Sequence, residues 1–128
     1  MLTIDLASTT PLAEQVAQGI RGAIARGEVR PGDELPSVRQ LAADLGINLN
    51  TVARAYRSLE ADGLVRSARG RGTRVTADVE ERTAKAAQRT TGALRRAITD
   101  AKLAGLGRRA VEREIRRQLD QLWPAKAR

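Results

Sequence analysis

Apolar residues recur at steps of three and four along three stretches in the first half of the chain, which is the spacing of one helix face. The stretches cover residues 11–27, 37–46 and 48–63. The inward positions are Leu12, Val16, Ile20 and Ile24, then Val38, Leu41, Ala42 and Leu45, then Val52, Ala55, Tyr56 and Leu59. The pattern predicts three amphipathic helices, with the second and third joined by a tight turn around Gly46.

Residues at the ends of these stretches support the same boundaries. The Thr10 hydroxyl before Pro11 is expected to cap the first helix, and Gly27 to end it in the left-handed conformation. Ser37 with Gln40 three residues later predicts a capping box at the second helix. Asn48 is expected to cap the third.

Residues 64–76, LVRSARGRGTRVT, read as two short β-segments around a glycine-rich turn. Strands this short are not stable alone, so the hairpin must pack on the helices. Residues 27–36 are expected to form a connector with a type II turn at Pro31-Gly32, and residues 3–7 a short extended arm.

The composition shifts to Ala, Arg and Glu after Thr76. Residues 78–104 predict one long helix, Gly105-Leu106-Gly107 a break, and the following residues up to Pro124 a final helix, with residues 125–128 frayed. The expected apolar contact positions of the two helices together are Leu94, Ile98, Ala101, Val111, Ile115, Leu119 and Leu122. These narrow, alanine-rich stripes bury little surface on their own, so this segment is expected to dimerise.

The fold class expected is therefore mostly α with a small β-hairpin. Residues 1–76 would form one domain of helices with the hairpin packed on them, and residues 77–128 a short helical dimerisation segment. The chain carries a formal net charge of +8, and the basic excess lies after residue 36. Such an excess favours a polyanionic partner, although a soluble arginine-rich protein remains an equally good interpretation of composition alone.

The absence of Cys and His removes thiolate and imidazole chemistry and the usual metal ligands, so we expect no enzyme, no metal and no cofactor. The N-terminus lacks the pattern of a signal peptide, and no apolar run has the length of a membrane span. These features predict a cytoplasmic protein.

The third helix would present polar residues at its N-terminal end, which is the part that reaches base edges when a helix enters the major groove. Those residues are Asn48, Leu49, Asn50, Thr51, Ala53 and Arg54, with Arg57 one turn further on. An ordinary helical hairpin with solvated polar ends is the competing interpretation. The hairpin that follows favours DNA binding, because it holds four arginines within nine residues, and arginine can enter a narrow minor groove. They are Arg66, Arg69, Arg71 and Arg74.

Four motifs in residues 2–76 resemble the winged helix-turn-helix domain of GntR-family bacterial transcription regulators. They are G-x-x-x-P-G-x-x-L-P-S-x-R-x-L-A from Gly27, N-T-V-x-x-A-Y from Asn50, L-x-x-x-G-L-V from Leu59, and G-R-G-T-x-V from Gly70. The short C-terminal segment is similar to that of the YtrA-like subfamily, which implies dimerisation.

The resemblance implies roles for individual residues. Arg39 matches an arginine that contacts DNA at the start of the second helix, and Arg69 with Gly70 matches the tip of the wing. Leu49 and Ala53 depart from the pattern, because they stand where some relatives place base-reading arginines. The full set of candidate DNA-binding residues is Arg39, Asn48, Leu49, Asn50, Thr51, Arg54, Arg57, Arg69, Gly70 and Arg71.

The sequence therefore favours a homodimeric transcriptional repressor that binds double-stranded DNA at an inverted-repeat operator. The resemblance implies control of its own operon and of a neighbouring transporter, and it allows a small-molecule effector whose pocket no residue marks. The alternative is a non-specific nucleic-acid or nucleoid-type protein driven by the basic C-terminal segment. A basic helix on a membrane surface is a third and weaker interpretation.

Overall fold

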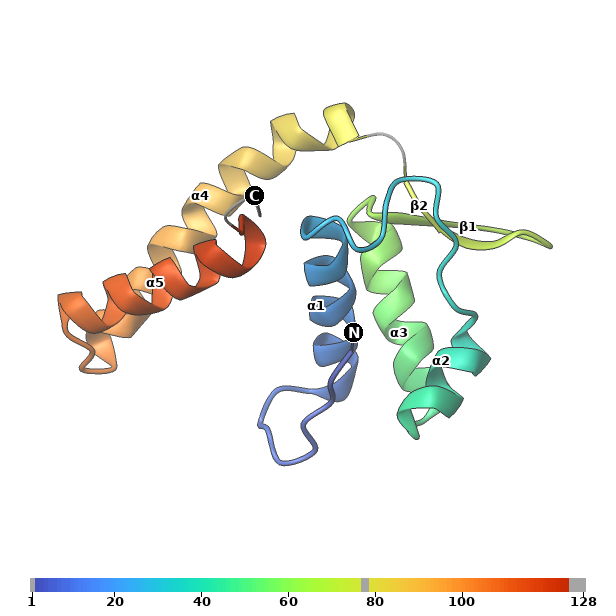
Figure 1. Cartoon of the computed structure of the whole chain (residues 1–128), viewed down its shortest axis with the longest axis horizontal. Coiled ribbons are helices and arrows are strands. Elements are labelled where there is room, and N and C mark those ends of the chain that lie inside the picture. The colour runs from blue at the N-terminus through green and yellow to red at the C-terminus, as the bar shows by residue number, and fades with distance from the viewer. Residues whose placement is uncertain (1, 77–78, 125–128) are drawn as a thin grey trace. The chain divides into compact units, whose positions relative to one another are not determined.

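All three helices expected in the first half of the chain form in the computed structural model, which describes residues 2–76 and 79–124. They are α1 (Leu12–Ala25), α2 (Val38–Leu45) and α3 (Leu49–Ala61). Helix α3 packs against both α1 and α2 (Figure 1). With the hairpin that follows, these helices belong to one compact unit, Met1–Ala77, which we call the head; Asp78–Arg128 forms a second unit, which we call the tail.

The core of the head is apolar, and it is built from the positions that the periodicity predicts. Val52, Ala55, Tyr56 and Leu59 of α3 are all at most 4% exposed. They meet Val16, Ala17, Ile20 and Ala23 of α1, Leu41 and Ala42 of α2, and Leu35, Val65 and Val75 from outside the helices. Apart from Tyr56 with its hydroxyl, no charged or polar side chain is buried among the described residues, so burial of apolar surface stabilises the head.

Two of the expected helix caps are wrong in detail. The N-cap of α1 is Pro11, and no side chain caps that end; the Thr10 carbonyl instead accepts a hydrogen bond of 2.9 Å from Gln15 Nε2. At α2, Ser37 Oγ accepts from the Gln40 backbone N–H at 3.0 Å, but the Gln40 side chain donates to Asp44 Oδ1 rather than closing a capping box. At α2 the competing acceptor Asp44 takes the Gln40 side chain.

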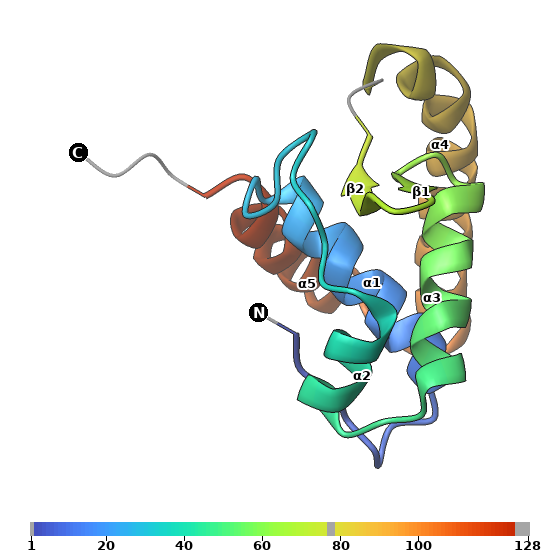
Figure 2. The same ribbon diagram turned by 90° about the vertical axis from the view of Figure 1, so that its right-hand side faces the viewer.

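The wing consists of β1 (Val65–Ala68) and β2 (Gly72–Val75), antiparallel, with Val65 opposite Val75 and Ala68 opposite Gly72. It follows directly from the C-terminal end of α3, as Figure 2 shows. The hairpin predicted for residues 64–76 therefore forms.

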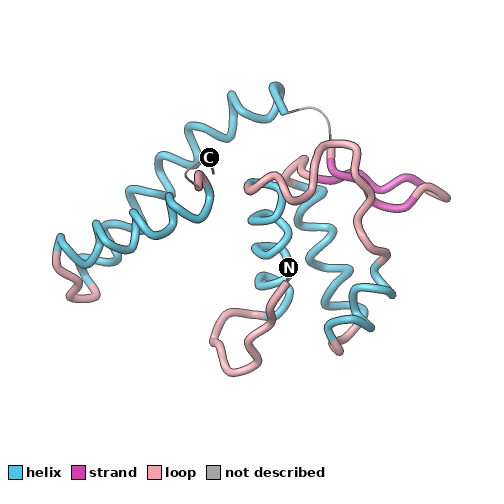
Figure 3. Tube along the Cα trace, viewed as in Figure 1, coloured by secondary structure: helices cyan, strands magenta, loops and turns pink. Residues whose placement is uncertain are grey.

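The connector between α1 and α2 does more than the sequence indicated, because it pairs with the outer edge of β2. Leu35 N donates to Thr73 O at 2.8 Å, Val75 N donates to Asp33 O at 2.9 Å, and Glu34 forms a β-bridge with Arg74. In Figure 3 this loop passes beside the magenta strands. The type II turn expected at Pro31-Gly32 is present, with Gly32 at φ 91° and a hydrogen bond from Asp33 N to Arg30 O.

Residues 3–7, where a short extended arm was expected, form no strand, and residues 6–7 form a turn. Leu2 and Ile4 pack against the core of the head, and the Gln15 side chain hydrogen-bonds both the N–H and the carbonyl of Asp5. The arm is therefore fixed by tertiary contacts.

The tail consists of α4 (Val79–Leu103) and α5 (Arg108–Leu122), which contact each other. Gly105, at φ 91°, ends the turn after α4, as the glycines in that stretch predicted. Asp78, the expected start of the long helix, and residues 125–128, expected to fray, lie outside the described residues. None of the tail side chains that the structure describes is buried, so the helix pair leaves its apolar stripes partly open to solvent.

Candidate nucleic acid interface

The turn between α2 and α3 is fixed by local hydrogen bonds. Gly46 adopts the left-handed conformation at φ 67°, and Ile47 N donates to Ala42 O at 3.1 Å. Asn48 Oδ1 then accepts from Asn50 N at 2.7 Å and caps α3. These bonds set the direction in which α3 leaves the turn, and so the direction of its exposed face.

A longer-range bond ties α3 to the chain that precedes α2. The Tyr56 hydroxyl donates to the Pro36 carbonyl at 2.6 Å across the core. Burial raises the pKa of Tyr56 to about 12, so the hydroxyl stays protonated and can donate this bond at neutral pH.

The exposed face of α3 carries the residues expected to reach DNA. Asn48, Asn50, Arg54 and Arg57 are exposed, and Leu49, at 42% exposure, projects an apolar side chain among them. Thr51 and Ala53 are half-buried. Asn48 uses its carbonyl oxygen as the helix cap, so only its amide NH₂ remains to donate to another group.

The guanidinium groups of five candidate arginines have no hydrogen-bond or ion-pair partner among the described residues: Arg39, Arg54, Arg57, Arg69 and Arg71. The other arginines of the head, except Arg30, are engaged. Arg21 pairs with Asp62, and Arg74 pairs with Glu34 at 3.2 Å and also donates to the Gly32 carbonyl. Apart from Arg30 in the connector, the unpaired guanidinium groups of the head thus lie on α2, α3 and the wing tip, whereas Arg74, which the sequence grouped with the wing arginines, holds the wing to the connector.

The tip of the wing presents Arg69, Gly70 and Arg71 to solvent. Arg71 N donates to Ala68 O at 2.9 Å, and Gly70 sits at φ 79°. A Cβ atom added at Gly70 would meet no atom within 4 Å, so backbone conformation rather than space requires glycine there. The Ser67 and Thr73 hydroxyls hydrogen-bond at 2.9 Å across the strands below the tip.

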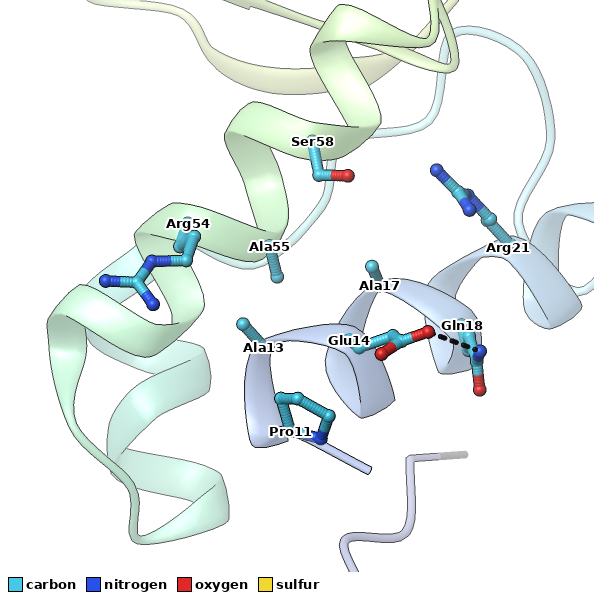
Figure 4. Close-up of a pocket in the computed structure, with 9 residues that line it drawn as sticks. All are labelled: Pro11, Ala13, Glu14, Ala17, Gln18, Arg21, Arg54, Ala55 and Ser58. Carbon is cyan, nitrogen blue, oxygen red and sulfur yellow. Dashed lines mark hydrogen bonds between the residues drawn. The ribbon is translucent and has the colours of Figure 1, made fainter. Parts of the chain in front are cut away.

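An open groove of about 400 Å³ separates part of α1 from α3. Figure 4 shows its floor formed by Ala13, Ala17 and Ala55, with Glu14 and Gln18 on the α1 side. The Arg54 side chain extends away from α1, so its guanidinium belongs to the exposed face of α3.

The apolar stripe of the tail forms a second candidate interface. Leu94, Ile98 and Leu119 remain 54%, 41% and 48% exposed, although α4 and α5 contact each other. The other positions expected there are half-buried, namely Ala101, Val111, Ile115 and Leu122. The two helices therefore cover the stripe only in part.

The family model for bacterial regulatory proteins of the gntR family matches residues 12–75, half of the chain. The chain belongs to the GntR family. The match to the GntR model runs from the start of α1 to the end of β2, so it includes every candidate DNA-binding residue.

Individual relatives agree with this assignment. The HTH-type transcriptional repressor YtrA from Bacillus subtilis (strain 168) is 45% identical over 76 residues, which cover 59% of this chain and 58% of that protein. A solved transcriptional antiterminator from Listeria monocytogenes EGD-e aligns with a TM-score of 0.85 at 25% identity, over 100% of this chain and 96% of that one. The DNA-binding domain of AraR, solved in complex with operator ORX1, aligns with a TM-score of 0.53 at 28% identity, over 59% of this chain and 93% of that one.

The GntR winged helix-turn-helix fold predicted from the motifs is therefore confirmed, and the chain spans about 58% of the length of the curated relative YtrA. Within the described part of the chain, no helix is long and apolar enough to cross a membrane.

Proposed function

We propose that this protein is a sequence-specific DNA-binding transcriptional regulator that acts as a repressor. The observation that carries the proposal is the grouping of unpaired arginines on α2, the exposed face of α3 and the wing tip of a GntR domain. Unpaired guanidinium groups lose little on moving from water to phosphate, since no internal ion pair has to break. The names of the YtrA repressor and the AraR–operator complex support the same partner.

Within this interface, the proposed roles differ by element. Asn50 and Arg54 on α3 would meet base edges in the major groove, with Leu49 against thymine methyl groups. Arg39 and Arg57 would contact phosphates, and Arg69 would enter the minor groove beside Gly70. Because Leu49 and Ala53 replace base-reading arginines, shape and apolar contact carry a larger share of specificity.

We propose further that the protein acts as a homodimer on an inverted repeat. The support is the apolar stripe of the tail, which stays open at Leu94, Ile98 and Leu119 and which a second copy would cover. Two heads related by a two-fold axis would read half-sites about one DNA turn apart, ~34 Å between centres. The proposed targets are its own operon and a neighbouring transporter, and an effector would act on this dimer.

The test is a binding titration with duplex from the promoter region of the protein's own gene, against random duplex of equal length. We expect salt-sensitive binding with a clear preference for the promoter duplex. Arg69→Ala should weaken binding to both duplexes. Asn50→Ala should cost about 1–3 kcal/mol on the promoter duplex alone, by relaxing one or two base positions.

Arg30→Ala is the matched control, because it removes one positive charge from an exposed residue outside the proposed interface. It should leave the preference intact. Equal affinity for promoter and random duplex would reject the regulator and favour the non-specific nucleic-acid-binding alternative.

A further inference from the structure

Three arginines form a row on the exposed side of α5, and we call Arg109, Arg113 and Arg116 the α5 row. All three are exposed, and none has an ion-pair partner among the residues that the structure describes. The neighbouring arginines differ. Arg108 pairs with Glu112 at 2.7 Å, and Arg117 pairs with Glu114 at 2.6 Å.

The ion pair between Arg117 and Glu114 persists over the physiological pH range. Hydrogen bonds from Arg117 and then Gln118 lower the pKa of the Glu114 carboxyl to about 2. Glu114 is therefore ionised and already engaged, and it lies off the face of the α5 row. The acids of α5 beside the row are Glu112, which pairs with Arg108, and Asp120. The row keeps a net positive charge after its acidic neighbours are counted.

The spacing of the α5 row places it opposite the apolar stripe. Steps of four and three residues put Arg109, Arg113 and Arg116 on one face at 3.6 residues per turn. Val111 and Ile115, which are half-buried, fall on the other side of the helix. Covering the apolar stripe by a partner would thus leave the arginines in solvent.

We propose that the α5 row is a second DNA contact, which binds the phosphate backbone of duplex without reading its sequence. The seven steps from Arg109 to Arg116 at 1.5 Å rise make the row about 10 Å long, which matches roughly three axial steps of ~3.4 Å between successive phosphates of one strand. The inference rests on the proposed function, because a head bound to DNA holds the linked tail at high effective concentration near the same duplex. When the head is bound to DNA, the α5 row therefore adds affinity that an isolated α5 helix would not show.

A duplex fits this surface better than a membrane does. A helix on a lipid surface inserts its apolar face. In α5 that face is half-buried at Val111, Ile115 and Leu122, and its open position, Leu119, belongs to the proposed dimer interface. Phosphate contact uses only the arginine side. The α5 row therefore serves DNA without competing for the apolar stripe.

The experiment measures the salt dependence of binding to random duplex by the full chain, between about 50 and 200 mM salt. Changing the α5 row to glutamine should reduce the slope of log K against log salt by up to about 2.7 per protomer, at ~0.9 for each lost phosphate contact. Changing the row to lysine should restore most of the slope, because lysine keeps the charge. A control with Arg26→Gln and Arg30→Gln removes two charges from the head, outside the proposed interface, and should keep the unmodified slope.

A glutamine variant with the unmodified slope overturns the proposal. If that variant also loses binding to phosphatidylserine vesicles, the surface binds lipid instead of DNA. If circular dichroism shows that the triple glutamine variant loses helix content, the single variant Arg113→Gln tests the proposal instead. Its slope of log K against log salt should fall by about 0.9. The proposed function has a separate readout: preference for promoter over random duplex can fail while the slope still responds to the α5 row.

Discussion

Tyr56 links two segments of the head through a single buried hydroxyl. Its bond to the Pro36 carbonyl spans the core between α3 and the segment before α2, and the ring is 4% exposed. The periodicity identified Tyr56 as an inward residue. It could not identify the acceptor, because Pro36 lies twenty residues away and meets Tyr56 only in the folded head.

Tyr56→Phe should lower the free energy of unfolding by about 1 kcal/mol at pH 8, because the Pro36 carbonyl loses its donor. The raised pKa of Tyr56 gives a pH signature. A pKa of about 12 in the folded state means that the neutral form is favoured by folding, so this stability is present below the unfolded value near 10 and is lost as pH rises toward 12.

Urea titrations at pH 8 and pH 11 measure both effects. The unmodified chain should lose more stability between these pH values than Tyr56→Phe does, and the chain contains no other tyrosine to confuse the comparison. Equal losses in the two proteins would contradict the proposed origin of the pKa shift.

Helix ends show where sequence patterns succeed and where they fail. Ser37 was predicted to cap α2 and does, because its hydroxyl needs only the local backbone N–H of Gln40. Thr10 was predicted to cap α1 and does not, because the chain turns so that Pro11 is the N-cap. The difference depends on the path of the arm before α1, which Gln15 fixes from within the helix.

Ser37→Ala should therefore destabilise the head by about 1 kcal/mol through loss of the cap. Thr10→Ala should change stability by less than about 0.5 kcal/mol, since its hydroxyl caps nothing. Thermal unfolding of the two variants beside the unmodified chain provides the comparison. A loss at Thr10 as large as that at Ser37 would show that the α1 end is capped in solution.

The wing was predictable as a hairpin, but the pairing of the connector with the outer edge of β2 was not. Alternation and glycines mark β1 and β2 in the sequence, whereas Asp33 and Leu35 of the connector pair with β2 without any strand pattern of their own. Such pairing depends on which edge lies nearby after folding. The same holds for Arg74: its type and position suggested DNA contact, and only the fold reveals its pairing with Glu34.

At the scale of the whole molecule, two units carry different parts of the proposed activity. The tail helices were predicted to within one or two residues, because alanine-rich composition and the Gly105-Leu106-Gly107 break are local signals. The partner that covers their apolar stripe could not be predicted in the same way, because it is not encoded by neighbouring residues. The stripe in the sequence indicates only that some partner is needed.

Ile98→Lys tests the proposed dimer, because it places a charge in the open part of the stripe. We expect a monomer by light scattering and at least tenfold weaker binding to the promoter duplex. Leu103→Lys is the matched control: Leu103 is 81% exposed on the same helix, and its spacing from Ile98 places it off the stripe. A dimer that survives Ile98→Lys would exclude this part of the stripe as the interface.

The scarcity of aromatic residues has a practical consequence. Tyr56 is the single tyrosine and lies buried in the head, while Trp123 is the single tryptophan and stands 72% exposed at the C-terminal end of α5. Each unit thus contains its own chromophore. Tryptophan emission reports on the tail, near-ultraviolet circular dichroism of Tyr56 reports on the head, and no label has to be attached to follow either one.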